Sequence, residues 1–177
     1  MSASVLCDLL LLVFVTAAAV SDLMCRKIPN RLVLAGLLAA FCLQGLLAPS
    51  SGLAGSLGGV ATGFFLFLPL YLLRGMAAGD VKLIAMVGAF AGPWPTLLIC
   101  LATFVLGGLM AVLIVTWQGN WRACWRNLRQ LPWPLMARTA GLPLASAPPT
   151  HQQSVGNMPY GLAIALGSVL VQGQNYF

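Results

Sequence analysis

Two aspartates, Asp22 and Asp80, are the residues of this sequence whose type and surroundings could do chemistry. The chain has only three acidic residues among 177, and Asp80 is followed at once by the apolar run 81–91. A carboxylate at the mouth of an apolar membrane helix is costly to keep, so it is a candidate functional group whose partner should be another ionisable group facing the same cavity. Only Asp8 and Asp22 could supply a second carboxylate.

A pair of neighbouring carboxylates suits one kind of chemistry. Close like charges cannot both ionise easily, so such a pair tends to share a proton. One carboxylate can then take a proton from water while the other donates a proton to a carbonyl, which is the arrangement of aspartic proteases. A structural interpretation is also open. Asp22 would then cap a helix or pair with Arg26 or Lys27, and Asp80 would cap the helix that follows it in the sequence. Conduction of ions or protons by the same carboxylates is another.

The rest of the chain offers little other catalytic chemistry. The single histidine, His151, lies in a proline-rich segment, and the sequence has neither a nucleophile-elbow serine nor a glycine-rich phosphate loop. The five cysteines form no CxxC pair and fall mostly within apolar runs. They therefore indicate neither a disulfide framework nor a zinc site. We expect no metal and no cofactor.

The composition is typical of an integral membrane protein. Hydrophobic residues make up 60% of the chain and charged residues 7%, whereas soluble domains carry roughly 25% charged residues. Nine Lys and Arg against three acidic residues give a net charge of +6, which in a membrane protein indicates topology first. The expected partner is thus the lipid bilayer and not nucleic acid. One polytopic domain, residues 1–177, is expected.

Six apolar runs must position the two aspartates. They predict an all-α fold of six transmembrane helices, over residues 5–21, 32–47, 53–73, 81–91, 97–117 and 158–171. All nine Lys and Arg lie in the loops after the first, third and fifth runs, at about 22–31, 74–82 and 118–157. By the positive-inside rule these loops are cytoplasmic and both termini lie on the non-cytoplasmic side. Asp22 and Asp80 then share the cytoplasmic face, and Asp8 lies on the other.

Local patterns predict how the runs pack. Gly55, Gly59 and Gly63 are spaced four residues apart, a doubled GxxxG that lets a neighbouring helix approach closely. The fourth run is short, because even the fourteen residues from Val81 to Trp94 rise only about 21 Å as a helix, against a hydrocarbon core of roughly 30 Å. Asp80 is therefore expected below the membrane surface, in a hydrated cavity.

Three patches resemble the type IV prepilin peptidases, a branch of the GxGD intramembrane aspartic proteases. The patches are Asp22 followed by Ile28-Pro29-Asn30, then Ala78-Gly79-Asp80-Val81-Lys82-Leu83, and finally Pro159-Tyr160-Gly161 with Ala163-Ile164-Ala165. They span nearly the whole chain in the expected order. One departure is that Ala77 stands at the first glycine of GxGD, a small intrusion unless that position needs positive φ.

The resemblance implies that Asp22 and Asp80 are the catalytic aspartates. It also implies that the substrate is a prepilin, whose basic leader is cleaved on the cytoplasmic side, just before the hydrophobic helix of the pilin. Gly79, Lys82 and Arg74 are candidates for substrate binding, the two cations by pairing with a glutamate of the mature pilin. The expected location is the bacterial inner membrane, with a possible association with the pilus secretion machinery.

The short loop between the first two runs distinguishes branches of the resembled family. Longer members carry an N-terminal cytoplasmic insertion with paired cysteines and also methylate the new amino terminus, and this chain lacks that insertion. It is similar to the short form that serves Flp-type (tight adherence) pili, which implies peptidase activity without methyltransferase activity. Two alternatives stay open, a small ion or proton transporter that uses the same carboxylates and a scaffold subunit of a secretion complex.

Overall fold

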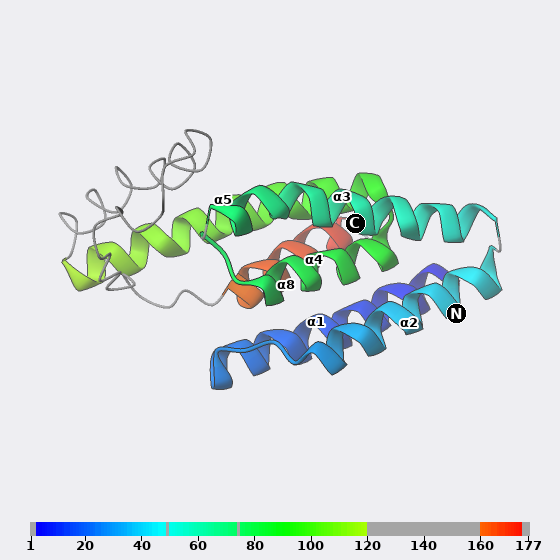
Figure 1. Ribbon diagram of the computed structural model, residues 1–177, viewed down its shortest axis with the longest axis horizontal. Coiled ribbons are helices and arrows are strands. Elements are labelled where there is room, and N and C mark those ends of the chain that lie inside the picture. The colour runs from blue at the N-terminus through cyan, green and yellow to red at the C-terminus, as the bar shows by residue number, and fades with distance from the viewer. Residues whose placement is uncertain (1–2, 49, 74, 120–159, 175–177) are drawn as a thin grey trace, which may run out of the picture.

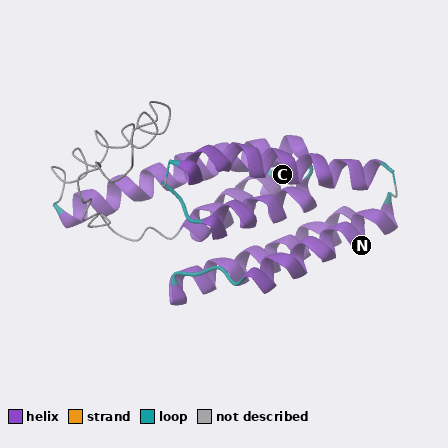
Figure 2. Ribbon diagram, in the orientation of Figure 1, coloured by secondary structure: helices purple, strands orange, loops and turns teal. Residues whose placement is uncertain are grey.

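Every regular element that the structure describes is a helix. The computed structural model describes residues 3–48, 50–73, 75–119 and 160–174, which form a bundle of helices (Figures 1 and 2). The helices are α1 (Ala3–Cys25), α2 (Asn30–Leu47), α3 (Ser51–Leu72), α4 (Ala78–Ala91), α5 (Pro93–Gln118) and α8 (Tyr160–Gly173). The predicted all-α fold is confirmed.

Four of these helices are long and apolar enough to cross a membrane, namely α1, α2, α3 and α5. Their outward faces carry many exposed large apolar side chains, among them Leu34, Leu38, Val105 and Leu109. Such faces suit lipid, so the chain is a multi-pass membrane protein. The helices α4 and α8 have 14 residues each, a rise of about 21 Å.

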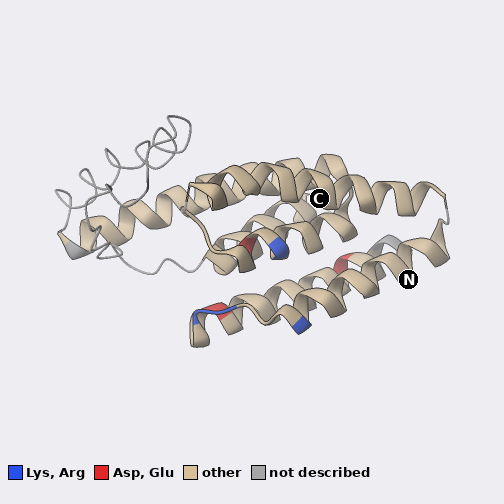
Figure 3. Cartoon of the chain, viewed as in Figure 1, with Lys and Arg blue, Asp and Glu red and all other residues tan. Residues whose placement is uncertain are grey.

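The helices run alternately in opposite directions along the bundle. In Figure 1, α1, α3 and α5 end at the side where α2, α4 and α8 begin. The Lys and Arg residues of the described part of the chain, at positions 26, 27, 31 and 82, lie in that half of the bundle (Figure 3). We call this the basic end. Arg74 and most of the predicted loop 118–157 lie outside the described residues.

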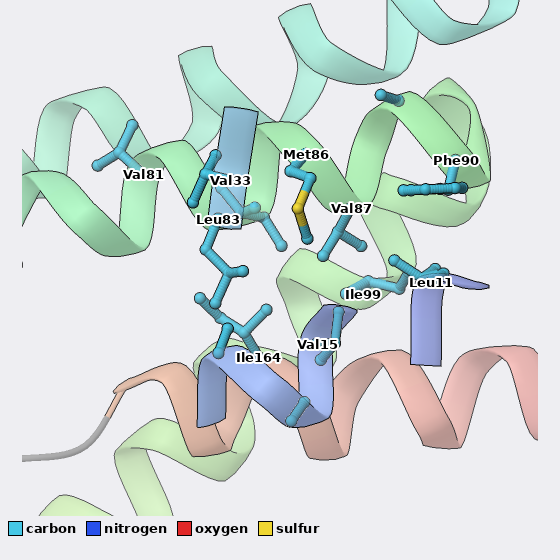
Figure 4. Close-up of a cluster of buried hydrophobic side chains, with 14 of the residues drawn as sticks. Leu11, Val15, Val33, Val81, Leu83, Met86, Val87, Phe90, Ile99 and Ile164 are labelled. Carbon is cyan, nitrogen blue, oxygen red and sulfur yellow. The ribbon is translucent and has the colours of Figure 1, made fainter. Parts of the chain in front are cut away.

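The short helix α4 is the centre of the bundle. From Leu83 to Phe90 every residue is buried, as expected of a helix that is apolar all round. Its side chains form one cluster with those of the surrounding helices (Figure 4), including Leu11, Val15, Val33, Ile99 and Ile164. A change in the position of α4 would therefore be felt by every neighbouring helix.

Glycines let α3 and α4 pack backbone against backbone. A Cβ added at Gly59 would overlap the carbonyl group of Gly88, and one at Gly63 would lie 2.7 Å from the carbonyl oxygen of Ile84. The close approach predicted from the doubled GxxxG is confirmed at these two positions. It is wrong at Gly55, which has nothing within 4 Å among the described residues. Gly55 lies one turn before Gly59 in α3, towards the end at which α4 stops at Ala91.

Side chains from α2 and α3 receive the end of α4. Ser56 Oγ donates to the carbonyl oxygen of Ala89 at 2.8 Å, and Gln44 Nε2 donates to that of Phe90 at 3.2 Å. The last carbonyl groups of a helix have no partner within the helix. An apolar surrounding makes an unpaired carbonyl expensive, so these two donors let α4 end inside the bundle.

Candidate active site

Asp22 lies in the last turn of α1 and not in the loop that was predicted to begin there. It continues a buried stripe of α1, formed by Leu11, Val15 and Ala18, so its side chain faces the bundle. The helix ends one turn later, where Arg26 adopts a left-handed φ of 53° and its N–H donates to the carbonyl oxygen of Asp22 at 2.9 Å. Asp22 is thus held on a regular helix and is only 8% exposed.

Asp80 lies in the first turn of α4, outside the four candidate spans, and is 5% exposed. Its Oδ2 accepts the N–H of Ala77 at 3.3 Å, and Ala77 is the N-cap residue directly before the helix. A carboxylate in this position is also favoured by the helix dipole. Ala77 has φ −81° and ψ 151°, an ordinary extended conformation. The alanine at the first position of the GxGD pattern is therefore accommodated without positive φ.

The segment between α1 and α2 packs on the first turns of α4. Ile28 lies against Gly79, where an added Cβ would come within 3.4 Å of the Cβ of Ile28. Lys82 Nζ donates to Asn30 Oδ1 at 3.1 Å. The loop is stiff because Pro29, with φ −64°, is the N-cap residue directly before α2. These contacts connect the end of α1, which carries Asp22, to the start of α4, which carries Asp80.

The first residues of α8 complete the surroundings of both carboxylates. The N–H of Gly161 donates to Asp22 Oδ2 at 2.9 Å, in a buried position. Gly161 is the second residue of α8, whose first N–H groups have no intrahelical acceptor, so the carboxylate of Asp22 supplies one. Tyr160 is half-buried beside them.

Asp22 acts electrostatically on Asp80. Burial raises the pKa of Asp80, the nearby charge of Asp22 raises it further, and the hydrogen bond from Ala77 opposes both effects. A carboxyl group in this state holds its proton more readily than an ordinary aspartate. Asp22 meanwhile accepts a buried backbone N–H from another helix, that of Gly161. The arrangement can therefore hold one proton between the two carboxyl groups.

The model of the type IV leader peptidase family matches residues 9–112. This is more than half of the chain. The chain therefore belongs to the type IV leader peptidase family. Comparison with curated proteins and with solved structures found no significant match. The matched residues include Asp22 and Asp80 but end before α8. Gly161, which donates to Asp22, therefore lies outside the matched region.

The other residues that the sequence singled out do not all lie near the two aspartates. Gly79 packs against Ile28, and the exposed Lys82 donates to Asn30, so both lie in the first turns of α4 near Asp80. Arg74 lies outside the described residues. Asp8 is far from the pair, because 14 residues of helix separate it from Asp22, about 21 Å along α1.

Sequence reasoning did not find the role of the Gly161 N–H. The signal that could have found it was the glycine itself, placed at the start of an apolar run. An added Cβ there would lie 2.9 Å from Asp22 Oδ2 and 3.0 Å from its Cβ, so the position has room only for hydrogen. A glycine in the first turn of a helix leaves its N–H open to an approaching anion.

Proposed function

We propose that this leader peptidase is a membrane-embedded aspartic endopeptidase that removes the basic leader of prepilins of the Flp (tight adherence) type. Asp22 and Asp80 are its catalytic residues, and cleavage takes place at the cytoplasmic face of the bacterial inner membrane. The observation that carries the proposal is that two buried carboxylates, one at the end of α1 and one at the start of α4, lie at the basic end of the bundle, where Asp22 raises the pKa of Asp80.

The surroundings of the two carboxylates support different roles for them. Asp80, whose pKa is raised by burial and by Asp22, carries the shared proton and donates it to the scissile amide. Asp22, which accepts the N–H of Gly161, acts as the base that takes a proton from the attacking water. This division of an acid and a base between two carboxyl groups follows the general logic of aspartic proteases. Hydrolysis needs no further cofactor in this scheme.

The direction of the helices supports the proposed topology. With α1, α3 and α5 ending at the basic end (Figure 1), the positive-inside rule puts that end in the cytoplasm. All six helices then cross or enter the membrane, and both termini lie on the non-cytoplasmic side. Both α4 and α8 are shorter than a full span, so the carboxylates at the start of α4 and the end of α1 sit below the surface, where water must reach them.

The turn between α1 and α2 supports the short branch of the family. It has only four residues, Arg26 to Pro29, and leaves no room there for a cysteine-bearing insertion. We therefore propose peptidase activity without methylation of the new amino terminus. We propose that the exposed Lys82, two residues after Asp80 in α4, pairs with a carboxylate of the pilin. Association with the pilus secretion machinery follows from the same proposal.

The proposal is tested by co-expressing the peptidase with a candidate Flp-type prepilin and following the loss of the leader as a gel shift. Asp22→Asn and Asp80→Asn keep the shape of each side chain but cannot exchange a proton, so we expect cleavage to fall by at least about a thousandfold, below detection. Each variant must be present in the membrane at the wild-type amount. A Glu at either position should also fail, because the longer side chain moves the carboxyl group out of place.

Two outcomes would contradict the proposal. Cleavage by either Asn variant at the wild-type rate would remove that aspartate from catalysis. If the wild type cleaves no prepilin and sealed vesicles instead show proton or ion flux that survives with Glu at either aspartate, the transporter alternative is the correct one. A methylated amino terminus on the processed pilin would refute only the assignment to the short branch.

A further inference from the structure

The helices α1 and α8 are joined by a side-chain hydrogen bond at each end of their contact. At the basic end, the N–H of Gly161 donates to Asp22. At the opposite end, Gln172 Nε2 donates to Asp8 Oδ1 at 2.9 Å. The first bond touches a proposed catalytic carboxylate. The second lies about 21 Å away along α1 and has no part in the chemistry.

The two bonds close a stripe of apolar packing. Between them α1 buries Leu11, Val15 and Ala18, and α8 buries Ile164 and Ala165. Figure 4 draws Leu11, Val15 and Ile164 in the same buried cluster. Apolar contacts of this kind resist separation of the helices but only weakly resist sliding or rotation, since one small aliphatic contact can replace another. The polar groups at the ends are what can fix the register.

Gln172 depends on Asp8 for its place in the bundle. The side chain is 5% exposed, and its Oε1 has no hydrogen-bond partner among the described residues. A buried amide with one unpaired oxygen is expensive to keep. The hydrogen bond from Gln172 Nε2 to Asp8 Oδ1 holds the amide in a single orientation.

We propose that Asp8 is a positioning residue, which through Gln172 fixes the register of α8 on α1 and so keeps the N–H of Gly161 on the carboxylate of Asp22. The inference rests on the proposed function, because it assigns Asp8 to the same reaction. A shift of α8 by a fraction of a residue would withdraw the N–H from Asp22 and change the charge distribution of the catalytic pair. Asp8 itself contacts no reacting atom.

The proposal is tested first by amide hydrogen exchange at Gly161 in the full chain, in lipid nanodiscs and without substrate. Gly161 is in the first turn of α8, so its N–H has no intrahelical acceptor and its protection reports the contact with Asp22. We expect Asp8→Leu and Gln172→Leu each to speed its exchange by about tenfold or more, towards the rate of an Asp22→Ala control. The wild type should exchange slowly.

The conservative variant supplies the decisive comparison. Asp8→Asn keeps an oxygen that accepts from Gln172 Nε2, so slow exchange at Gly161 should be retained or nearly so. Asp8→Leu and Gln172→Leu combined remove both partners of this hydrogen bond, and removing both partners is tolerated better than removing one. We expect this double variant to fold even if a single variant does not, and its Gly161 N–H to exchange fast.

Prepilin cleavage then connects the register to catalysis. With Asp8→Leu we expect kcat to fall about tenfold to a hundredfold, the cost of a small misplacement at a catalytic centre, and KM to change less than about twofold. Asp8→Asn should restore kcat, which a general base or acid at Asp8 could not tolerate. This contrasts with Asn at Asp22 or Asp80.

The exchange measurement separates the failure of this inference from the failure of the proposed function. Unchanged protection of Gly161 in both the Asp8→Leu and the double variant would overturn the positioning role, whatever the activity. An Asp8→Asn variant as defective as Asp8→Leu would also overturn it, since the charge and not the hydrogen bond would then matter. Fast exchange in a protein that cleaves no prepilin would support the register argument and reject only the peptidase mechanism.

Discussion

The two buried aspartates each accept one backbone N–H, but the donors come from different distances along the chain. The donor to Asp80 is the N–H of Ala77, three residues before it at the start of the same helix. The donor to Asp22 is the N–H of Gly161, which is 139 residues away and belongs to another helix. The geometry of Asp80 is therefore built into one helical turn, whereas that of Asp22 depends on how α8 packs against α1.

The difference shows which part of the molecule each carboxylate depends on. The hydrogen bond of Asp80 lies within the start of α4 and does not depend on where α4 is placed in the bundle. The position of Asp80 relative to Asp22 therefore depends on the contacts between α4 and its neighbours. Those contacts are the glycine packing of α3 on α4 and the packing of Ile28 on Gly79. Asp22 lies on the long helix α1, and its hydrogen bond forms only if α8 brings the N–H of Gly161 to it.

The largest effect should come from displacing α4 as a whole. Gly59→Val places its side chain against the backbone of Gly88, which cannot yield as a flexible side chain would. We expect a loss of stability of at least about 3 kcal/mol, at the upper end of overpacking costs. The variant should give little monodisperse protein in detergent and no prepilin cleavage.

Gly55→Val is the matched control for this prediction. It adds the same side chain to the same helix one turn earlier, where nothing lies within 4 Å among the described residues. Its yield, melting temperature and cleavage rate should stay close to wild type. If both valine variants fail equally, the valine itself disturbs α3 and the specific contact with α4 is not the cause.

A smaller effect is expected from disturbing only the donor to Asp22. Gly161→Ala puts a methyl group 2.9 Å from Asp22 Oδ2, so the carboxylate or α8 must move by a few tenths of an ångström. Folding should be little affected, because alanine is the better helix former by about 1 kcal/mol. We expect kcat for prepilin cleavage to fall about tenfold to a hundredfold.

Gly173→Ala, in the last turn of the same helix, is the comparison for Gly161→Ala. An added Cβ there meets nothing within 4 Å among the described residues, so cleavage should be unchanged. Equal kinetics in the two alanine variants would contradict the view that Asp22 requires the close approach of Gly161. Both can be compared in purified protein at matched melting temperatures.

The local features of the site could be predicted from the sequence. The scarcity of acidic residues made Asp22 and Asp80 conspicuous, and the distribution of Lys and Arg placed them at one end of the bundle. The stiffness of the turn before α2 followed from Pro29. Each of these signals comes from residues close in sequence or from a simple count along the chain, so no knowledge of helix packing was needed.

The contacts of α8 could not be predicted in the same way. This helix is short and nearly uniformly apolar, so no polar face indicates which side meets α1. The partnerships of Gly161 with Asp22 and of Gln172 with Asp8 depend on the rotation and register of α8, which arise only when the bundle is assembled. Gly55 illustrates the same limit, since the GxxxG pattern does not reveal where the partner helix ends.

The smallest predicted effect concerns the local donor to Asp80. The Ala77 N–H favours the charged form of Asp80 and lowers its pKa against the raising effects of burial and Asp22. Ala77→Pro removes that N–H, and the φ of −81° at this position is within reach of proline. The pKa of Asp80 should then rise further. If Asp80 must be protonated to donate to the amide, activity is lost as pH rises through this pKa.

The alkaline limb of the pH–rate profile should therefore move to higher pH in Ala77→Pro, by about one unit at most for a bond as long as 3.3 Å. Ala78→Pro is the control, because proline suits the first helical position and leaves the Ala77 N–H in place. It also demands an extended residue before it, which Ala77 already is. A limb that moves to lower pH, or moves equally in both variants, would mean that Asp80 does not act as the acid.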